Sequence, residues 1–335
     1  MPVPPKIVRR LILAPLVVTV ELVLLILSPL LALVALIASP FTGGLRPLRL
    51  LAIAEACVAY HLGATLAVFG LWIASGFGWK LRSEPMVRAH YALMRWFVGG
   101  IYRVATRMAK VVVVFEESEA THDLLSGKRG PVVLLSRHAG EGETLFVLHE
   151  LLTRHDRGPR VVMHERFRLD SMIDALGERL PNRFVDPRGG DTEVEIAAMA
   201  EELENSGALV IFPEGRNFSQ ETRRRGIERL EQGGWHKQAA AAKEMTHVSA
   251  PRPGGTLAAI EAAPHCDVVI MAHDGFPTGL REVWELLPQP QTIEVRLWHE
   301  PASAVPEGRE DQIDWLFSWW RTLDSWVHER QDKPR

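Results

Sequence analysis

The sequence of 335 residues contains only two cysteines, Cys57 and Cys266, and Cys57 lies within an apolar run. This scarcity argues against a disulfide framework, and nothing indicates an oxidising compartment. The chain also lacks an excess of basic residues: its net charge is −3. We therefore expect no nucleic-acid partner, which would need a basic face. Charged residues are scarce before Lys80 and frequent after it, so an apolar N-terminal third precedes a more polar remainder.

Two catalytic motifs are missing as well. The Gly-x-Ser-x-Gly sequence that exposes a serine nucleophile in α/β-hydrolases does not occur. A zinc-binding helix needs a second histidine four residues after His149, but Thr153 stands there and the next histidine is His155. Six residues apart, the two imidazoles point to different faces of a helix. We therefore expect neither a serine hydrolase nor a metal site.

Two long apolar runs make up most of the N-terminal third. In residues 11–39, 19 of 29 side chains are Leu, Ile or Val, and Glu21 alone is charged. Each such residue favours lipid by roughly 0.3 to 0.6 kcal/mol, against a cost of about 3 kcal/mol for a central carboxylate. A second run covers residues 50–77, and both exceed the roughly 20 residues that cross a bilayer. We expect residues 1–84 to form a membrane-anchoring helical hairpin with its turn at 40–47.

Basic residues at the ends of these runs indicate an orientation. Lys or Arg stands at positions 6, 9 and 10 before the first run and at 80, 82 and 88 after the second, whereas only Arg46 and Arg49 lie between. The positive-inside rule then places both ends of the hairpin, and the domain that follows, on the cytoplasmic side of the cell membrane. A monotopic hairpin that enters one leaflet is the alternative.

Three polar residues, Glu21, Glu55 and His61, interrupt the apolar runs. Ionisable groups at membrane depth often form a relay or a ligand site. The simpler interpretation, which we favour, is that Glu21 and Glu55 face each other inside the hairpin.

Residues 85–108 mix arginines with aromatic residues at near-helical spacing. One interpretation is a helix at the bilayer surface, with Trp96, Phe97 and Tyr102 directed toward acyl chains. The other is an ordinary amphipathic helix that packs against the core. The sequence does not favour either.

After Lys110 the chain changes to short β-rich runs that alternate with helical segments. The runs lack polar–apolar alternation, which indicates strands covered on both faces. This order predicts an α/β domain over residues 85–335, with a mixed, largely parallel sheet flanked by helices and with sites at the carboxyl ends of strands. The expected strands are 111–115, 131–136, 159–163, 208–212 and 267–273, and the expected helices are 143–154, 192–203, 253–263 and an amphipathic C-terminal helix at 309–330.

The first candidate site follows the expected strand 131–136. His138 is succeeded by two glycines that permit a tight turn, and Glu143 opens the next helix. Across this turn the Glu143 carboxylate can accept a hydrogen bond from Nδ1–H of His138, which leaves Nε2 free to take a proton from a hydroxyl. The pair would be two members of a catalytic triad, with the substrate alcohol as the nucleophile. A hydrogen-bonded loop histidine without a catalytic role gives the same pattern.

The second candidate site follows the expected strand 208–212 and has the sequence Phe-Pro-Glu-Gly-Arg-Asn-Phe-Ser at 212–219. Arg216 can hold a phosphate through a bidentate contact at the carboxyl end of a strand. An ordinary turn with a surface arginine is the alternative.

In this order, some 75 residues apart, the two candidates resemble the 1-acylglycerol-3-phosphate acyltransferase (lysophosphatidate acyltransferase) family. Its motifs are a His, four residues and an Asp, followed downstream by Phe-Pro-Glu-Gly-Thr-Arg. The resemblance covers about residues 110–275. It implies that His138 is the catalytic base and that Glu143 takes the place of the Asp. It also implies acceptor-binding residues, which are Glu214, Gly215, Arg216, Asn217 and, from a looser similarity at 184–188, Arg188.

The chain departs from the family pattern at three positions. Glu143 is one methylene longer than Asp. Arg216 stands at the Thr position and Asn217 at the Arg position, so contact with a phosphate shifts by one residue or falls to Arg188 or Arg252. These departures leave the identity of the acceptor open.

The resemblance implies transfer of a fatty acyl group from acyl-CoA or acyl-carrier protein to the free hydroxyl of 1-acylglycerol-3-phosphate, which gives phosphatidic acid for phospholipid biosynthesis. The implied partners are a lipid bilayer, a lysophospholipid acceptor and an acyl thioester donor, without a cofactor. Two alternatives remain. One is the same chemistry on another lysophospholipid or a glycolipid, and the other is a non-catalytic membrane homologue.

Overall fold

The computed structural model describes residues 3–127, 130–140, 142–186, 190–287 and 289–332. Seven strands form one sheet in the order β1-β7-β6-β2-β5-β3-β4. The five neighbours from β6 to β4 run parallel, whereas β7 is antiparallel to β6 and β1 is parallel to β7. The predicted α/β domain with a mixed, largely parallel sheet is therefore confirmed. The strands are β1 (Val111–Glu116), β2 (Val132–Ser136), β3 (Gly158–His164), β4 (Arg183–Val185), β5 (Gly207–Ile211), β6 (Asp267–Asp274) and β7 (Gln291–Glu300).

The sequence prediction missed β4 and β7. It placed β1 correctly but was wrong that both faces of this strand are covered. β7 buries Ile293, Val295 and Leu297 and leaves the residues between them more exposed, a one-sided pattern unlike the continuous runs of the central strands. β1 lies at the edge of the sheet, and Val112 and Val114 are 59% and 49% exposed. Its outer face is therefore not covered, although its sequence is uniformly apolar.

Helices cover both faces of the central strands because these strands carry apolar side chains on both sides. In β2, Val133 and Leu135 pack into one core cluster, and Val132 and Leu134 pack into another. The first cluster is completed by α8 (Thr192–Glu201), α9 (Gln220–Gln232), α10 (His236–Glu244), α11 (Pro253–Ala262) and α13 (Arg309–Gln331). The second is completed by α5 (Glu119–Ser126) and α6 (Glu143–His149), which continues as the π-helical turn η3 (Glu150–Arg154). The remaining elements of the domain are α4 (Glu84–Ala109), η4 (Glu165–Leu169), α7 (Ser171–Arg179), α12 (Leu280–Leu286) and η5 (Ala302–Ala304).

Helix α4 corresponds to the predicted amphipathic segment 85–108, and it packs against the core. Phe97 is buried in a cluster formed by α4, α7 and the N-terminal hairpin. Tyr102 stacks on His149 of α6, with ring centroids 3.7 Å apart. Trp96 is 45% exposed, but it packs against Tyr60 of the N-terminal hairpin with ring centroids 4.8 Å apart. All three aromatic residues therefore contact protein, which contradicts the bilayer-surface interpretation of this helix.

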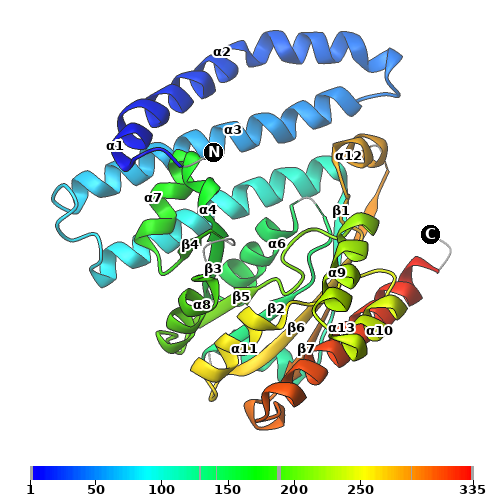
Figure 1. The fold of residues 1–335 in the computed structure, drawn as a ribbon. Coiled ribbons are helices and arrows are strands. Elements are labelled where there is room, and N and C mark those ends of the chain that lie inside the picture. Colours follow the sequence, from blue (N-terminus) through cyan, green and yellow to red (C-terminus); the bar gives the residue numbers. More distant parts are fainter. Residues whose placement is uncertain (1–2, 128–129, 141, 187–189, 288, 333–335) are drawn as a thin grey trace.

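Two long helical segments form the predicted N-terminal hairpin (Figure 1). By length and composition, Lys6–Phe41 and Arg46–Ala74 are both long and apolar enough to cross a membrane. The first consists of α1 (Lys6–Val8), the π-helical turn η1 (Arg9–Leu13), α2 (Ala14–Ala38) and the 3-10 turn η2 (Ser39–Phe41), and the second is α3 (Arg46–Ala74).

Helix α3 contacts the sheet domain along its length. Near its start, Arg49 donates a hydrogen bond to the carbonyl of Met108 at the end of α4 (2.6 Å). Near its end, the carbonyl of Val68 accepts one from Arg179 of α7 (2.6 Å). In Figure 1, α2 and α3 run above α4, which separates them from the sheet. Helix α3 therefore lies along the domain, and α2 packs on α3.

Polar residues inside the hairpin connect it to α7. Nδ1 of His61 lies 2.5 Å from the Glu21 carboxylate, and its Nε2 lies 3.0 Å from Asp170. Asp170 also caps α7, because it accepts hydrogen bonds from the backbone N–H groups of Met172 and Ile173. The predicted pairing of Glu21 with Glu55 is thus replaced by a link between α2, α3 and α7.

Candidate active site

The sheet brings the two sequence motifs together at one edge. β2 lies between β5 and β6, and Leu134 pairs with Val210 on one side and Val269 on the other. All three strands run parallel, so the residues that follow them meet at the same carboxyl-terminal edge. The histidine of the first motif and the glutamate of the second come from two of these strand ends.

His138 and Glu143 form the predicted pair. Nδ1 of His138 is hydrogen-bonded to Oε1 of Glu143. Oε2 of Glu143 accepts the backbone N–H groups of Ala139 (2.5 Å) and Gly140 (3.0 Å), so the carboxylate also closes the turn. Nε2 of His138 has no hydrogen-bond partner in the described part of the chain, and the side chain is 23% exposed. This geometry fixes the imidazole and leaves one nitrogen available to a substrate hydroxyl.

Two glycines shape the turn that joins this pair. Gly142 has φ +85°, a left-handed conformation that costs a residue with Cβ more than it costs glycine. A Cβ on Gly140 would lie 2.7 Å from the carbonyl oxygen of Pro277, which is too close for any other residue without movement of the backbone. The turn therefore depends on glycine at both positions.

The second motif holds the backbone of His138 from both sides. The N–H of His138 donates to Oε1 of Glu214 (3.0 Å), and its carbonyl accepts the N–H of Phe218 (2.6 Å). The imidazole also packs against Phe212, with ring centroids 4.8 Å apart. The segment that the resemblance assigns to the acceptor thus also positions the histidine.

Glu214 is buried, and both of its carboxylate oxygens are occupied by backbone donors. Oε1 accepts from His138, and Oε2 accepts the N–H of Ser249 (2.8 Å). Burial raises the pKa of Glu214 to about 7, although the Arg137 guanidinium and the two N–H donors favour the ionised form. The geometry therefore favours a positioning role for Glu214, and its predicted contact with the acceptor stays a prediction.

Sequence reasoning missed two buried residues beside the pair. Nε2 of His273, at the end of β6, lies 3.4 Å from Oε2 of Glu143 and 3.3 Å from the carbonyl of Arg137, and burial keeps its pKa well below 6.5. Arg137 in turn donates to the carbonyl of His273 (2.6 Å). The sequence did contain a signal for His273: it is a polar residue at the end of an expected strand. The carboxyl ends of parallel strands meet at one edge of a sheet, so His273 could have been expected near His138.

Arginines gather next to the second motif. Gly215 has φ +70°, and a Cβ there would lie 3.4 Å from Nε of Arg252. Burial, and then the neighbouring guanidinium groups of Arg229 and Arg216, lower the pKa of Arg252. None of these three arginines forms an ion pair with the residues that the structure describes. The cluster of Arg216, Arg229 and Arg252 is therefore able to receive an anion.

The other predicted acceptor residues are less informative. Arg188 lies outside the described residues. Asn217 is half-buried, and its backbone carbonyl accepts a hydrogen bond from the Thr222 hydroxyl (3.2 Å). The roles of both residues stay predictions.

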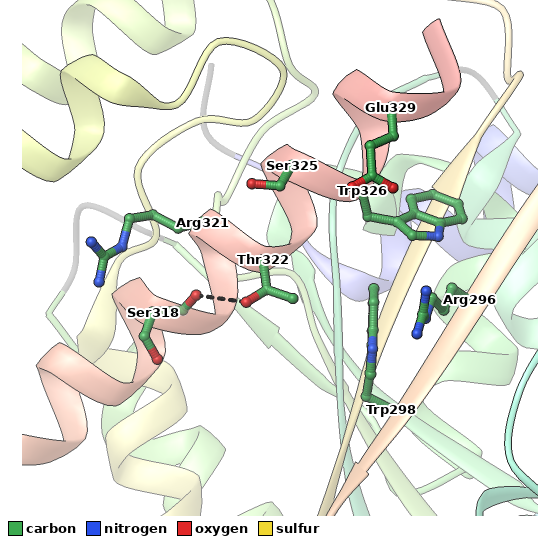
Figure 2. A pocket seen from close by; sticks show the side chains of 8 residues that line it. All are labelled: Arg296, Trp298, Ser318, Arg321, Thr322, Ser325, Trp326 and Glu329. Atoms are coloured by element: carbon green, nitrogen blue, oxygen red, sulfur yellow. Dashed lines mark hydrogen bonds between the residues drawn. The ribbon is translucent and has the colours of Figure 1, made fainter. Parts of the chain in front are cut away.

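A surface hollow of about 530 Å³ lies elsewhere on the molecule, between β7 and α13 (Figure 2). Arg296 and Trp298 line it from β7, and Trp326 lines it from α13. The Thr322 hydroxyl in this hollow already donates to the carbonyl of Ser318 (3.1 Å). No described residue of the two motifs lines the hollow, so we assign it no part in their chemistry.

Comparison with sequence models of protein families matches residues 96–271, more than half of the chain, to the family described as Acyltransferase. That family includes 1-acylglycerol-3-phosphate acyltransferases. Searches of curated proteins and of solved structures give no match.

Proposed function

The chain belongs to the acyltransferase family, and from this premise we propose that it transfers a fatty acyl group from an acyl thioester to the free hydroxyl of 1-acylglycerol-3-phosphate. The product is phosphatidic acid, and the thiol of CoA or of acyl-carrier protein is released. The observation that carries the proposal is the imidazole of His138, fixed at Nδ1 by Glu143 and without a described partner at Nε2.

In the proposed reaction His138 acts as the general base. Nε2 accepts the proton of the acceptor hydroxyl while the oxygen attacks the thioester carbonyl carbon, and a new C–O bond forms. The C–S bond then breaks, and the imidazolium returns the proton to the leaving thiolate, so that no cofactor is needed. Ionised Glu143 stabilises the imidazolium. The base contributes about 10²–10⁴-fold, and positioning of the two substrates supplies more.

A thiol-release assay with purified protein, acyl-CoA and a panel of acceptors tests this proposal. We expect rapid release with 1-acylglycerol-3-phosphate and slow release with a monoacylglycerol, which has the hydroxyl but no phosphate. Equal rates with both would point to a different acceptor. No release with any acceptor, from either acyl-CoA or acyl-carrier protein, would support a non-catalytic homologue.

The acceptor phosphate binds, in this proposal, to the cluster of Arg216, Arg229 and Arg252. We expect Arg252→Gln to raise KM for 1-acylglycerol-3-phosphate about tenfold with little change in kcat. The variant loses a charge-assisted contact with the phosphate, and this contact stabilises the bound substrate and the transition state equally. Steady-state kinetics with this acceptor measures the effect. Arg224→Gln is the matched control, since Arg224 is exposed on α9 and is already paired with Glu221 and Glu228. An unchanged KM in Arg252→Gln would place the phosphate elsewhere.

The pH dependence of the reaction follows from the environment of His138. Burial lowers the pKa of His138 to about 4, below the ordinary value of 6.5. A general base acts in its neutral form, so kcat/KM rises as the pH passes upward through this pKa and is level above it. We expect a plateau that extends down to about pH 6, measured at constant ionic strength, with activity recovered on return to neutral pH. An acid limb centred at or above neutrality would contradict this assignment.

We also propose that the hairpin enters only one leaflet of the membrane. A helix that spans a bilayer carries one end to the far side, but α3 touches the sheet domain at both ends, through Arg49 and through Val68. Most of the large apolar side chains of α2 are exposed, and Phe77 and Trp79, just after α3, are 69% and 87% exposed. Exposed aromatic residues of this kind favour the membrane–water interface. The arrangement supports the monotopic alternative, on the cytoplasmic side.

A further inference from the structure

A cavity of about 920 Å³ lies where the hairpin meets the sheet domain. Residues of η1, α2, α3, η4, α7 and β4 line it. None of the residues of the His138 site, and none of the three arginines of the acceptor cluster, is among its lining residues. The cavity is therefore separate from the proposed acceptor site.

One wall of this cavity carries an excess of positive charge. Its charged lining residues are two acids, Glu178 and Glu195, and six bases, Lys6, Arg10, Arg82, Arg168, Arg179 and Arg183, a net charge of +4. Lys6, Arg10 and Arg168 all reach the carboxylate of Glu178, at 2.6, 3.3 and 2.8 Å. Behind the lining, the buried Asp174 also pairs with Arg10 (3.2 Å) and Arg168 (3.4 Å) and is shared with Arg9.

Two further arginines that line the cavity form no ion pair in the described part of the chain. Arg82 is exposed and forms no ion pair there. Arg179 donates to the Val68 carbonyl, and burial and then the charge of Arg10 lower its pKa to about 10. The positive charge of the wall is thus only partly neutralised by protein.

The cavity also has an apolar lining, which comes from the hairpin. Leu11, Val68, Phe69 and Trp72 line it, and Leu11 and Phe69 are 71% and 59% exposed. The cavity therefore combines cationic side chains with apolar side chains of the two helices that we place in the membrane. An inorganic anion would match only the cationic side chains.

Two hydroxyl groups add a second indication of a ligand. Thr65 and Ser171 both line the cavity, and neither hydroxyl oxygen, although buried, has a hydrogen-bond partner among the described residues. Buried hydroxyls are normally paired, because an unpaired one loses its contacts with water. A polar headgroup in the cavity gives both side chains a partner after a change of rotamer.

We propose that this cavity binds one anionic phospholipid of the bilayer, with its phosphate at Arg82 and Arg168 and its acyl chains along Leu11, Phe69 and Trp72. The lipid is a bound component and not a reactant, because the cavity contains no residue of the His138 pair. It neutralises the cationic wall and fixes the base of the hairpin at the membrane surface.

The test uses the full-length protein in a neutral detergent, titrated with dioleoyl phosphatidylglycerol and analysed by native mass spectrometry. We expect one tightly bound phosphatidylglycerol per chain and much weaker binding of dioleoyl phosphatidylcholine. The double change Arg82→Gln with Arg168→Gln should weaken phosphatidylglycerol binding about 30-fold, since each basic residue near an anionic lipid contributes a similar part of the binding free energy. Equal binding by this variant and the wild type would overturn the proposal.

The matched control is the pair Arg88→Gln with Arg166→Gln. Arg166 lies two residues from Arg168 on η4, Arg88 is exposed on α4, and neither lines the cavity. Their loss should leave binding unchanged. Arg82→Gln alone removes an unpaired, exposed side chain, so it reports on the site even if the double variant misfolds, and it should still weaken binding several-fold.

Two further measurements distinguish a bound phospholipid from a simple anion and from a substrate of acyl transfer. Inorganic phosphate should not displace phosphatidylglycerol; displacement at a similar concentration would mean a simple anion site. His138→Ala should bind phosphatidylglycerol as the wild type does. If His138→Ala lost this lipid, the cavity would be part of the acyl-transfer site and the proposal would fail, whatever the outcome of the activity assay.

Discussion

His138→Ala is expected to lower the rate of acyl transfer by about 10²–10⁴-fold, because the general base is lost while the binding of both substrates remains. The fold should not be affected. The contacts that hold this segment use the backbone N–H and carbonyl of His138, which alanine retains. Thiol release with 1-acylglycerol-3-phosphate, together with a thermal melt of the same preparation, measures both quantities.

A control for this variant is His122→Ala, which removes a histidine of α5 that is 45% exposed in its side chain and pairs with Glu117. It should leave the rate unchanged. Turnover by His138→Ala at the rate of this control would remove His138 from the mechanism, and with it the main support for the proposed reaction.

Glu143→Gln is expected to lower kcat by about 10²-fold, since an amide cannot offer the negative charge that stabilises the imidazolium. The structure adds a second reason. Oε2 of Glu143 accepts two backbone N–H groups while Oε1 meets Nδ1 of His138. Gln has only one acceptor oxygen, so one set of donors would face its –NH₂ group.

Glu143→Asp is the informative comparison for this position. The family motif has Asp here, and the shorter carboxylate keeps both the charge and the two acceptor oxygens, so we expect activity that equals or exceeds that of the wild type. Single-turnover rates of the three proteins, at one pH on the plateau, separate these outcomes. Equal rates for Glu, Asp and Gln would mean that this residue does not orient the base.

The sequence predicted those parts of the fold that depend on local pattern. The central strands are covered on both faces, so their apolar runs are continuous and easily found. β7 was missed because it alternates, and β4 because three residues carry little signal. β1 was misjudged for a different reason. Val112 and Val114 are apolar yet exposed, and which strand lies at a sheet edge is decided by the order of strands in space.

The candidate site shows the same division between local and distant information. His138 and Glu143 flank one turn, so their spacing alone indicated a hydrogen bond, and the structure contains it. The position of Glu214 between His138 and Ser249 depends on segments 76 and 35 residues away, which no local pattern reports. Likewise, His61 binds Glu21 and Asp170 because three helices meet there, whereas hydropathy alone favoured a pair of glutamates.

The contact of α3 with its own domain at both ends has a consequence for the bilayer as a whole. A catalyst that is confined to one monolayer converts single-chain lipids into two-chain lipids in that monolayer only. Each turnover changes the packing and the preferred curvature of that side, while the other side stays as it was. Under the proposed insertion into one leaflet, growth of the membrane by this route needs a separate passage of lipid across the midplane, because the protein would have no access to the opposite surface.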